Sequence, residues 1–129
     1  MAGELILVVE DNEKNRKLVR DLLTVKGYIV VETETGEEAL TLAQSRRPAL
    51  VLMDIQLPGI DGIETLRRLR ADPSTASIPV VAVTASAMTQ DRQKIVAAGF
   101  DGYQAKPLSV RPFLELVRAV LDRPQGGPK

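Results

Sequence analysis

Five polar residues follow short apolar runs of this 129-residue chain, and their side chains could do chemistry together. They are Glu10, Asp11, Asp54, Thr84 and Lys106. Carboxylate oxygens are the ligands that Mg²⁺ prefers, and converging acidic groups need a cation to offset their repulsion. A carboxylate can also attack a phosphoryl group once a metal neutralises the phosphoryl oxygens. The set therefore indicates metal-dependent phosphoryl chemistry. The simpler interpretation is that these are ordinary charged loop residues balanced by a salt bridge.

Asp54 is the predicted nucleophile because it would lie at the end of the central strand, between the acidic pair and Lys106. Lys106 is a compact cation that would pair with Asp54 at rest and with a phosphoryl oxygen later. Thr84 would donate its hydroxyl to the phosphoryl group. Two alternatives stay open: Asp54 binds only the metal while Asp11 or another group reacts, and Thr84 is an ordinary satisfied polar residue.

The sequence alternates about five times between short apolar runs and longer amphipathic stretches. This pattern is typical of repeated βα units, and these are the elements that would position the polar groups. Strands are expected at 5–9, 28–32, 50–53, 80–83 and 102–105. Helices are expected between Asn12 and Gly27 (with Leu18, Val19, Leu22 and Leu23 as the apolar positions), from Thr35-Gly36 towards Pro48, and at 62–71, 88–98 and 110–121. The prediction is an α/β fold, a doubly wound five-stranded parallel sheet with helices on both faces. Such sheets bind ligands at the carboxyl ends of their strands.

Composition removes several classes of function. The chain has no Cys and no His, which excludes disulfides, thiol nucleophiles, Ser-His-Asp triads and His-ligated metals. Seventeen basic residues balance seventeen acidic ones, so nucleic acid and anionic membranes are not expected partners. No apolar run approaches the roughly 20 residues of a membrane span, and a cytoplasmic location is expected. The length fits one domain, predicted at residues 1–123, with 124–129 as a short flexible tail.

Four separated motifs give the chain a family resemblance over nearly its whole length. They are Val9-Glu10-Asp11-Asn12, Met53-Asp54-Ile55-Gln56-Leu57-Pro58 with Gly62, Val83-Thr84-Ala85, and Lys106-Pro107. In this order they resemble bacterial two-component response regulator receiver domains of the CheY-like kind, whose fold is flavodoxin-like. Within that family, residues 8–12 and 79–88 look most like DivK-type single-domain regulators and the receivers of hybrid kinases.

The resemblance implies a role for each matching residue. Asp54 would be the phosphoacceptor, and Asp11, Asp54 and the main-chain carbonyl of Gln56 would bind Mg²⁺ or Mn²⁺, with Glu10 acting on the metal through water. Lys106 and Thr84 would hold the phosphoryl group. Thr84 and Tyr103 would form the conformational switch, and the bond from Lys106 to Pro107 would be cis. Glu10 stands where many receivers carry Asp, which we expect to alter metal affinity rather than abolish it.

The expected function is phosphoryl transfer from phosphohistidine to Asp54, followed by slow hydrolysis, with no other enzymatic activity. Because the chain has no His, a histidine kinase or histidine phosphotransfer protein must be the donor. Few residues follow Leu121, so a stand-alone regulator is expected, which binds a target protein through its fourth helix, fifth strand and fifth helix. The helical arginines Arg67, Arg68 and Arg70 are interpreted as a solvated face rather than a binding patch.

Four alternatives remain. The chain could be a receiver from a larger hybrid kinase, or a receiver-fold scaffold that is never phosphorylated. A phosphohydrolase would need a second acid, and the position two residues after Asp54 is Gln56. A flavin-binding protein of the same fold class would need a phosphate loop after the first strand, where Glu10 and Asp11 would repel phosphate.

Overall fold

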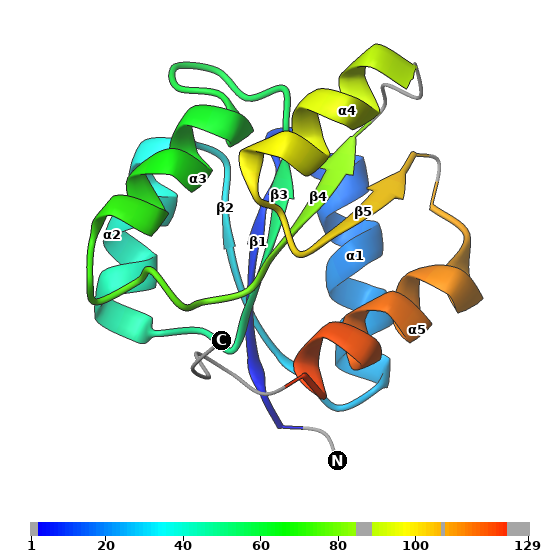
Figure 1. Ribbon diagram of the computed structural model, residues 1–129. Coiled ribbons are helices and arrows are strands. Elements are labelled where there is room, and N and C mark those ends of the chain that lie inside the picture. The colour runs from blue at the N-terminus through cyan, green and yellow to red at the C-terminus, as the bar shows by residue number, and fades with distance from the viewer. Residues whose placement is uncertain (1–2, 85–88, 107, 124–129) are drawn as a thin grey trace.

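The computed structural model is a single five-stranded parallel sheet with helices on both faces (Figure 1). It describes residues 3–84, 89–106 and 108–123, with the backbone alone for 89–92. In chain order the elements are β1 (Leu5–Val9), α1 (Glu13–Val25), β2 (Ile29–Thr33), α2 (Gly36–Arg46), β3 (Leu50–Asp54), α3 (Gly62–Ala71), β4 (Val80–Thr84), α4 (Thr89–Ala98), β5 (Gly102–Ala105) and α5 (Val110–Leu121). The strands lie in the order β2-β1-β3-β4-β5, which confirms the predicted fold class.

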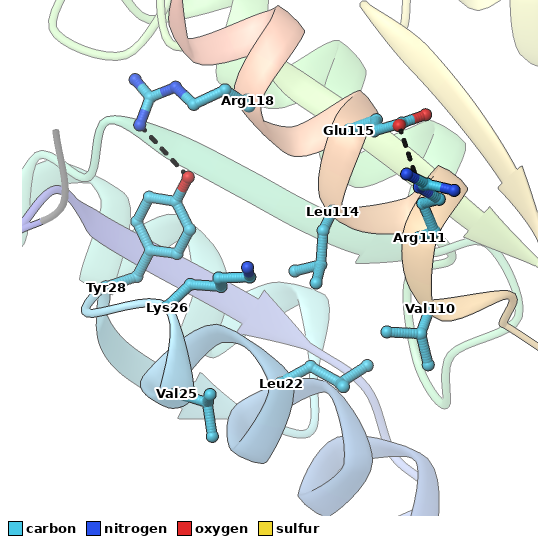
Figure 2. A pocket seen from close by; sticks show the side chains of 9 residues that line it. All are labelled: Leu22, Val25, Lys26, Tyr28, Val110, Arg111, Leu114, Glu115 and Arg118. Carbon is cyan, nitrogen blue, oxygen red and sulfur yellow. Dashed lines mark hydrogen bonds and ion pairs between the residues drawn. The ribbon is translucent and has the colours of Figure 1, made fainter.

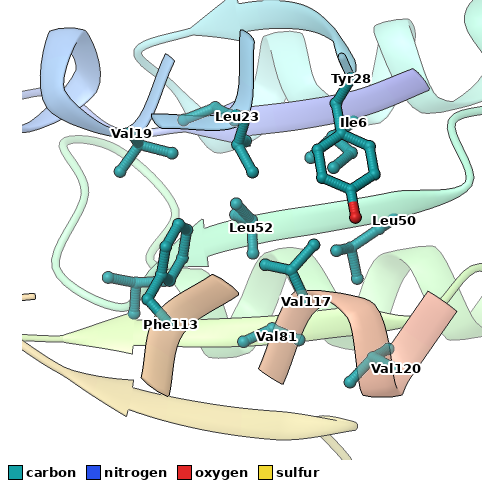
Figure 3. Close-up of a cluster of buried hydrophobic side chains, with 12 residues drawn as sticks. Ile6, Val19, Leu23, Tyr28, Leu50, Leu52, Val81, Phe113, Val117 and Val120 are labelled. Carbon is teal, nitrogen blue, oxygen red and sulfur yellow. The ribbon is translucent and has the colours of Figure 1, made fainter. Parts of the chain in front are cut away.

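The sheet separates two apolar layers because successive strand side chains point to opposite faces. In β1, Ile6 and Val8 face α1 and α5, whereas Leu7 and Val9 face α2 and α3. Figure 3 shows the first of these layers, in which side chains of β1, β3 and β4 pack against α1 and α5. The central strands are buried on both faces, so they read in the sequence as continuous apolar runs.

Most element bounds agree with the prediction to within one residue. The second strand is shifted by one position, because the Tyr28 N–H donates to the Leu23 carbonyl at the end of α1 and so lies outside the sheet. Of the four apolar positions predicted for this helix, Val19 and Leu23 form the buried face of α1, whereas Leu18 is 42% exposed. The last helix and the fifth strand have the predicted bounds.

Side-chain caps begin the helices next to the carboxyl edge of the sheet. Asn12 accepts a hydrogen bond from the Asn15 N–H, as expected for an N-cap, and Asp61 accepts one from the Glu64 N–H. At its other end α1 finishes at Val25, and Gly27, two residues on, has a φ of 91° that favours glycine. The caps fix where α1 and α3 start, and therefore where the loops carrying acidic residues turn.

The arginines of α3 divide into two groups. Arg67 and Arg68 both pair with Glu64 on the exposed surface, as a solvated face requires. Arg70 differs from the prediction because it is partly buried and holds other segments together. Its guanidinium donates to the carbonyls of Ala76 and Ile78 and to Asp101 at 3.1, 2.6 and 2.9 Å. Arg70 thus ties the link before β4 to the start of β5.

Two expectations concern residues outside the described part of the chain: the cis bond to Pro107 and the tail 124–129; Ala85, the last residue of the third motif, also lies outside it. Within the described residues, no helix has the length and apolar character needed to cross a membrane.

Candidate functional site

The predicted site residues meet at the carboxyl edge of the sheet. Asp54 and Thr84 end β3 and β4, while Glu10 and Lys106 follow β1 and β5 directly. The Lys106 Nζ lies 2.7 Å from Glu10 Oε1 and 3.1 Å from Asp54 Oδ2. Residues that are 96 positions apart in the sequence are thus in direct contact, because parallel strands bring their carboxyl ends to one edge.

Three carboxylates form a cluster suited to a hard divalent cation. Glu10, Asp11 and Asp54 each offer an oxygen, and these oxygens lie within 4.8 Å of one another. Glu10 and Asp54 are buried, whereas Asp11 is exposed. The all-oxygen donor set is the one that Mg²⁺ prefers, and the exposed Asp11 leaves one side of the cluster open to water. The residues present therefore fit a magnesium site.

Asp54 is held on both of its carboxylate oxygens. Oδ1 accepts a hydrogen bond from the Gln56 N–H at 3.1 Å, and Oδ2 accepts one from Lys106 at 3.1 Å. The Gln56 main chain is therefore at the site, although its carbonyl as a metal ligand stays a prediction. These two bonds fix the Asp54 carboxylate at the end of the central strand.

Burial and charge act in opposite directions on Glu10 and Lys106. Burial raises the pKa of Glu10, and the nearby Asp54 carboxylate adds to the increase, while Lys106 and the Asn12 N–H offset part of it. Burial alone would lower the pKa of Lys106, but its bonds to Glu10 and Asp54 outweigh this and raise it. Lys106 is thus a charged ammonium that neutralises part of an acidic, mostly buried cluster.

Sequence reasoning predicted the pair of Lys106 with Asp54, which the structure confirms, and missed the pair of Lys106 with Glu10. The signal was present in the residue type. Glu is one methylene longer than Asp, so its carboxylate reaches farther from the end of β1. The reach of the side chain could be judged only once the positions of β1 and β5 were known.

Gly62 permits the close approach of α3 to Asp54. Its N–H donates to the Ile55 carbonyl at 2.8 Å, and a Cβ at this position would lie 2.4 Å from the Asp54 carbonyl oxygen. Any larger residue would push the start of α3 away from β3. The sequence marked Gly62 as part of a motif, and the structure supplies the steric reason for it.

Thr84 and Tyr103, the predicted switch pair, lie on neighbouring strands. Thr84 is buried, and its carbonyl accepts the Lys106 N–H at 2.8 Å. Tyr103 is half-buried on β5 and pairs with Ala82 of β4. Their placement is compatible with a switch, but the switching itself stays a prediction.

An apolar pocket of about 640 Å³ lies away from this site, between α1 and α5 (Figure 2). Leu22 and Val25 of α1 face Val110 and Leu114 of α5 across it, and Arg118 donates to the Tyr28 hydroxyl at one end. Its lining contains none of the three clustered carboxylates, Glu10, Asp11 and Asp54. The chemistry therefore centres on the sheet edge and not on this pocket.

Comparisons with known proteins agree with this geometry. Residues 6–118 match the response regulator receiver domain family. The polar-differentiation response regulator DivK of Brucella anthropi is 47% identical over 116 residues, which cover 90% of this chain and 94% of that protein.

Solved structures give the same result. The receiver domain of a sensor histidine kinase from Pseudomonas aeruginosa, which has a magnesium ion coordinated in its active-site cleft, superposes with a TM-score of 0.88 at 32% identity and covers 94% of this chain and 99% of that one. A response regulator described as putative from Chloroflexus aurantiacus superposes with a TM-score of 0.90 at 30% identity, with the same coverage. The chain belongs to the response regulator receiver domain family and is a signalling domain of the two-component type.

Proposed function

We propose that this receiver domain accepts a phosphoryl group from a phosphohistidine on Asp54 and passes the signal on by binding another protein. One observation carries the proposal: the buried Asp54 carboxylate lies at the end of the central strand, clustered with two further carboxylates and in contact with the Lys106 ammonium. This is the arrangement that an aspartyl phosphate needs, because negative charge on the phosphoryl oxygens must be neutralised on several sides.

In the proposed reaction an Asp54 oxygen attacks phosphorus as the bond from phosphorus to the donor imidazole nitrogen breaks. The imidazole leaves with the electron pair, and Asp54 becomes an acyl phosphate. Lys106 and the Thr84 hydroxyl then bind phosphoryl oxygens. Slow attack by water on phosphorus regenerates the carboxylate and releases inorganic phosphate. The Gln56 N–H, which holds Asp54 Oδ1, orients the nucleophile for the first step.

A divalent cation, Mg²⁺ or Mn²⁺, would be held by Asp11, Asp54 and the Gln56 carbonyl, with Glu10 acting through water, and would neutralise the phosphoryl oxygens. The oxygen cluster and the magnesium ion of the Pseudomonas aeruginosa neighbour support this assignment.

The proposed donor is a histidine kinase or a histidine phosphotransfer protein, since this chain contains no His. The proposed output surface is formed by α4, β5 and α5, where Tyr103 would turn inward as Thr84 moves towards the phosphoryl group. The receiver unit is proposed to extend over residues 1–123, around the family match at 6–118. DivK-type relatives support a role as a regulator in a phosphorelay.

The test is intact mass spectrometry after incubation with acetyl phosphate and Mg²⁺. The native chain is compared with Asp54→Asn, with a matched control, Asp21→Asn, and with a sample in which the metal is chelated. Asp21 is an exposed aspartate of α1 that pairs with Lys17, so its loss leaves the site unchanged. We expect one added phosphoryl group on the native chain and on Asp21→Asn, and none on Asp54→Asn or after chelation.

The bond type provides an independent check. Because the chain contains neither His nor Cys, a label that hydroxylamine releases must be a carboxyl phosphate. A label that persists in Asp54→Asn would move the phosphoacceptor to another residue. If neither acetyl phosphate nor a phosphohistidine donor labels the native chain, the protein is a receiver-fold scaffold instead.

A further inference from the structure

Arg16 of α1 connects Glu10, a member of the carboxylate cluster, to the edge strand β2 of the sheet. It lies in the first half of α1, and only 15% of its side chain is exposed. Its Nη1 donates to the Glu10 main-chain carbonyl at 2.9 Å, and its Nε donates to the Glu32 carboxylate at 3.2 Å. Its Nη2 lies 3.7 Å from the Glu34 carboxylate. The guanidinium of this one α1 residue therefore links the helix to the end of β1 and to the end of β2.

The bond to the Glu10 carbonyl matters because that carbonyl belongs to the peptide unit joining Glu10 to Asp11. A peptide unit is planar, so fixing its oxygen also fixes the direction in which the chain enters Asp11. The Glu10 N–H donates to the Thr33 carbonyl at 3.0 Å, and the Asn12 N–H donates to the Glu10 carboxylate at 3.1 Å. Backbone bonds and Arg16 thus hold Glu10 from both sides.

Asp11 has no comparable support from the residues that the structure describes. It is exposed, and no hydrogen bond or ion pair to its carboxylate is found among the described residues. The place of its oxygen in the cluster then depends on the backbone before it. In that stretch of backbone, the Arg16 side chain holds the Glu10 carbonyl.

We infer that Arg16 is a positioning residue of the metal site: it orients the peptide between Glu10 and Asp11 so that the Asp11 carboxylate faces the cation. The inference rests on the proposed function, since it takes the carboxylate cluster to be that metal site. It adds a residue outside the cluster, whose effect reaches the metal through the backbone. Groups that orient metal ligands in this way typically change metal affinity by about 10- to 100-fold when they are removed.

A rival explanation is that Arg16 makes only surface ion pairs. Arg20 provides the matched control, because it lies one turn later in α1 and contacts the same Glu32 carboxylate at 3.1 Å. Arg20 is more exposed, and none of its described contacts is with Glu10. A variant at Arg20 therefore removes one ion pair of Glu32 but leaves the Glu10 carbonyl bonded to Arg16.

The experiment measures Mg²⁺ affinity by isothermal titration calorimetry on native protein, Arg16→Ala, Arg16→Lys and Arg20→Ala. Lysine keeps the charge but lacks the planar fork that reaches several partners at once. We expect the dissociation constant to rise about tenfold in Arg16→Ala and several-fold in Arg16→Lys, and to stay unchanged in Arg20→Ala. Labelling by acetyl phosphate should be slow in Arg16→Ala at low Mg²⁺ and return to the native rate at saturating Mg²⁺.

The outcomes separate the inference from the proposed function. Native Mg²⁺ binding with equal dissociation constants for Arg16→Ala and Arg20→Ala overturns the inference alone. A native affinity in Arg16→Lys also overturns it, because charge and not orientation would then be sufficient. If Arg16→Ala does not fold, the Mg²⁺ dissociation constants of Arg16→Lys and Arg20→Ala are compared instead, and equal values overturn the inference. A native chain that takes up neither Mg²⁺ nor a phosphoryl group overturns the proposed function and the inference together.

Discussion

Replacing Gly62 with alanine should disturb Asp54 without changing any reactive side chain. The new Cβ would lie 2.4 Å from the Asp54 carbonyl oxygen and 2.8 Å from the Ile55 Cα. The first distance is about 1 Å short of the 3.4 Å at which ordinary contact begins. Both neighbours are backbone atoms, which cannot rotate away, so α3 or the end of β3 must shift. Overpacking of this kind costs about 1 to 3 kcal/mol, and a displacement of about 1 Å at a reacting group can slow the reaction roughly 100-fold.

The control is Gly102→Ala, at the start of β5, where the nearest atom to a new Cβ is the flexible Leu116 Cδ1 at 3.0 Å. Because the chain has no Trp, unfolding is followed in urea by far-ultraviolet circular dichroism, and phosphorylation by the initial rate of mass gain with acetyl phosphate. Gly62→Ala should lose stability and rate, whereas Gly102→Ala should lose neither to a comparable extent. Equal stability and equal rates for the two variants would refute the steric argument.

Two further predictions follow from the charges. Lys106→Met removes the ammonium that contacts both buried carboxylates, and should lower the free energy of unfolding without metal by about 3 kcal/mol, the low end for a broken buried pair. Added Mg²⁺ should restore part of this loss in urea titrations, and no response to Mg²⁺ would contradict the reasoning. Glu4→Gln tests pH dependence: the bond from Arg118 lowers the pKa of Glu4 below its ordinary 4.5, so its stabilising effect is present above pH 4.5 and lost as the pH falls through the lowered value. The difference in urea midpoint between native and variant should therefore shrink on acidification, and a constant difference would exclude Glu4 as its source.

The fold was largely predictable because its strands are buried on both faces. A strand covered by helices on both sides must be apolar throughout, so runs such as residues 50–53 and 80–83 were visible without knowledge of the tertiary structure. The sequence says less where tertiary contacts decide which residue joins a strand and which apolar residue is buried. Tyr28 belongs to the turn that closes α1 rather than to β2, and Leu18 is apolar yet faces solvent. Periodicity alone does not distinguish these cases.

The site was predictable at the level of residue type and position along the sheet. Parallel strands bring their carboxyl ends together, so the polar residues that end or directly follow four strands had to converge on one edge. The individual contacts between these side chains and their surroundings could not be predicted. The reach of Glu10 to Lys106, the clearance at Gly62 and the bond from Arg16 to the Glu10 carbonyl all depend on the distances between elements.

The two contacts of Lys106 bear on how the site can change state. Its ammonium lies 2.7 Å from Glu10 and 3.1 Å from Asp54, so the two carboxylates share one cation. In the proposed reaction Asp54 becomes an acyl phosphate, which would no longer carry the carboxylate charge that Lys106 neutralises. The new charge would lie on the phosphoryl oxygens. Lys106 would follow that charge, while the buried Glu10 carboxylate would still be available to it as a partner. The longer acid at position 10 is therefore suited to hold Lys106 beside Asp54 before and after the proposed phosphorylation, because neither state would leave the partly buried ammonium without an anion.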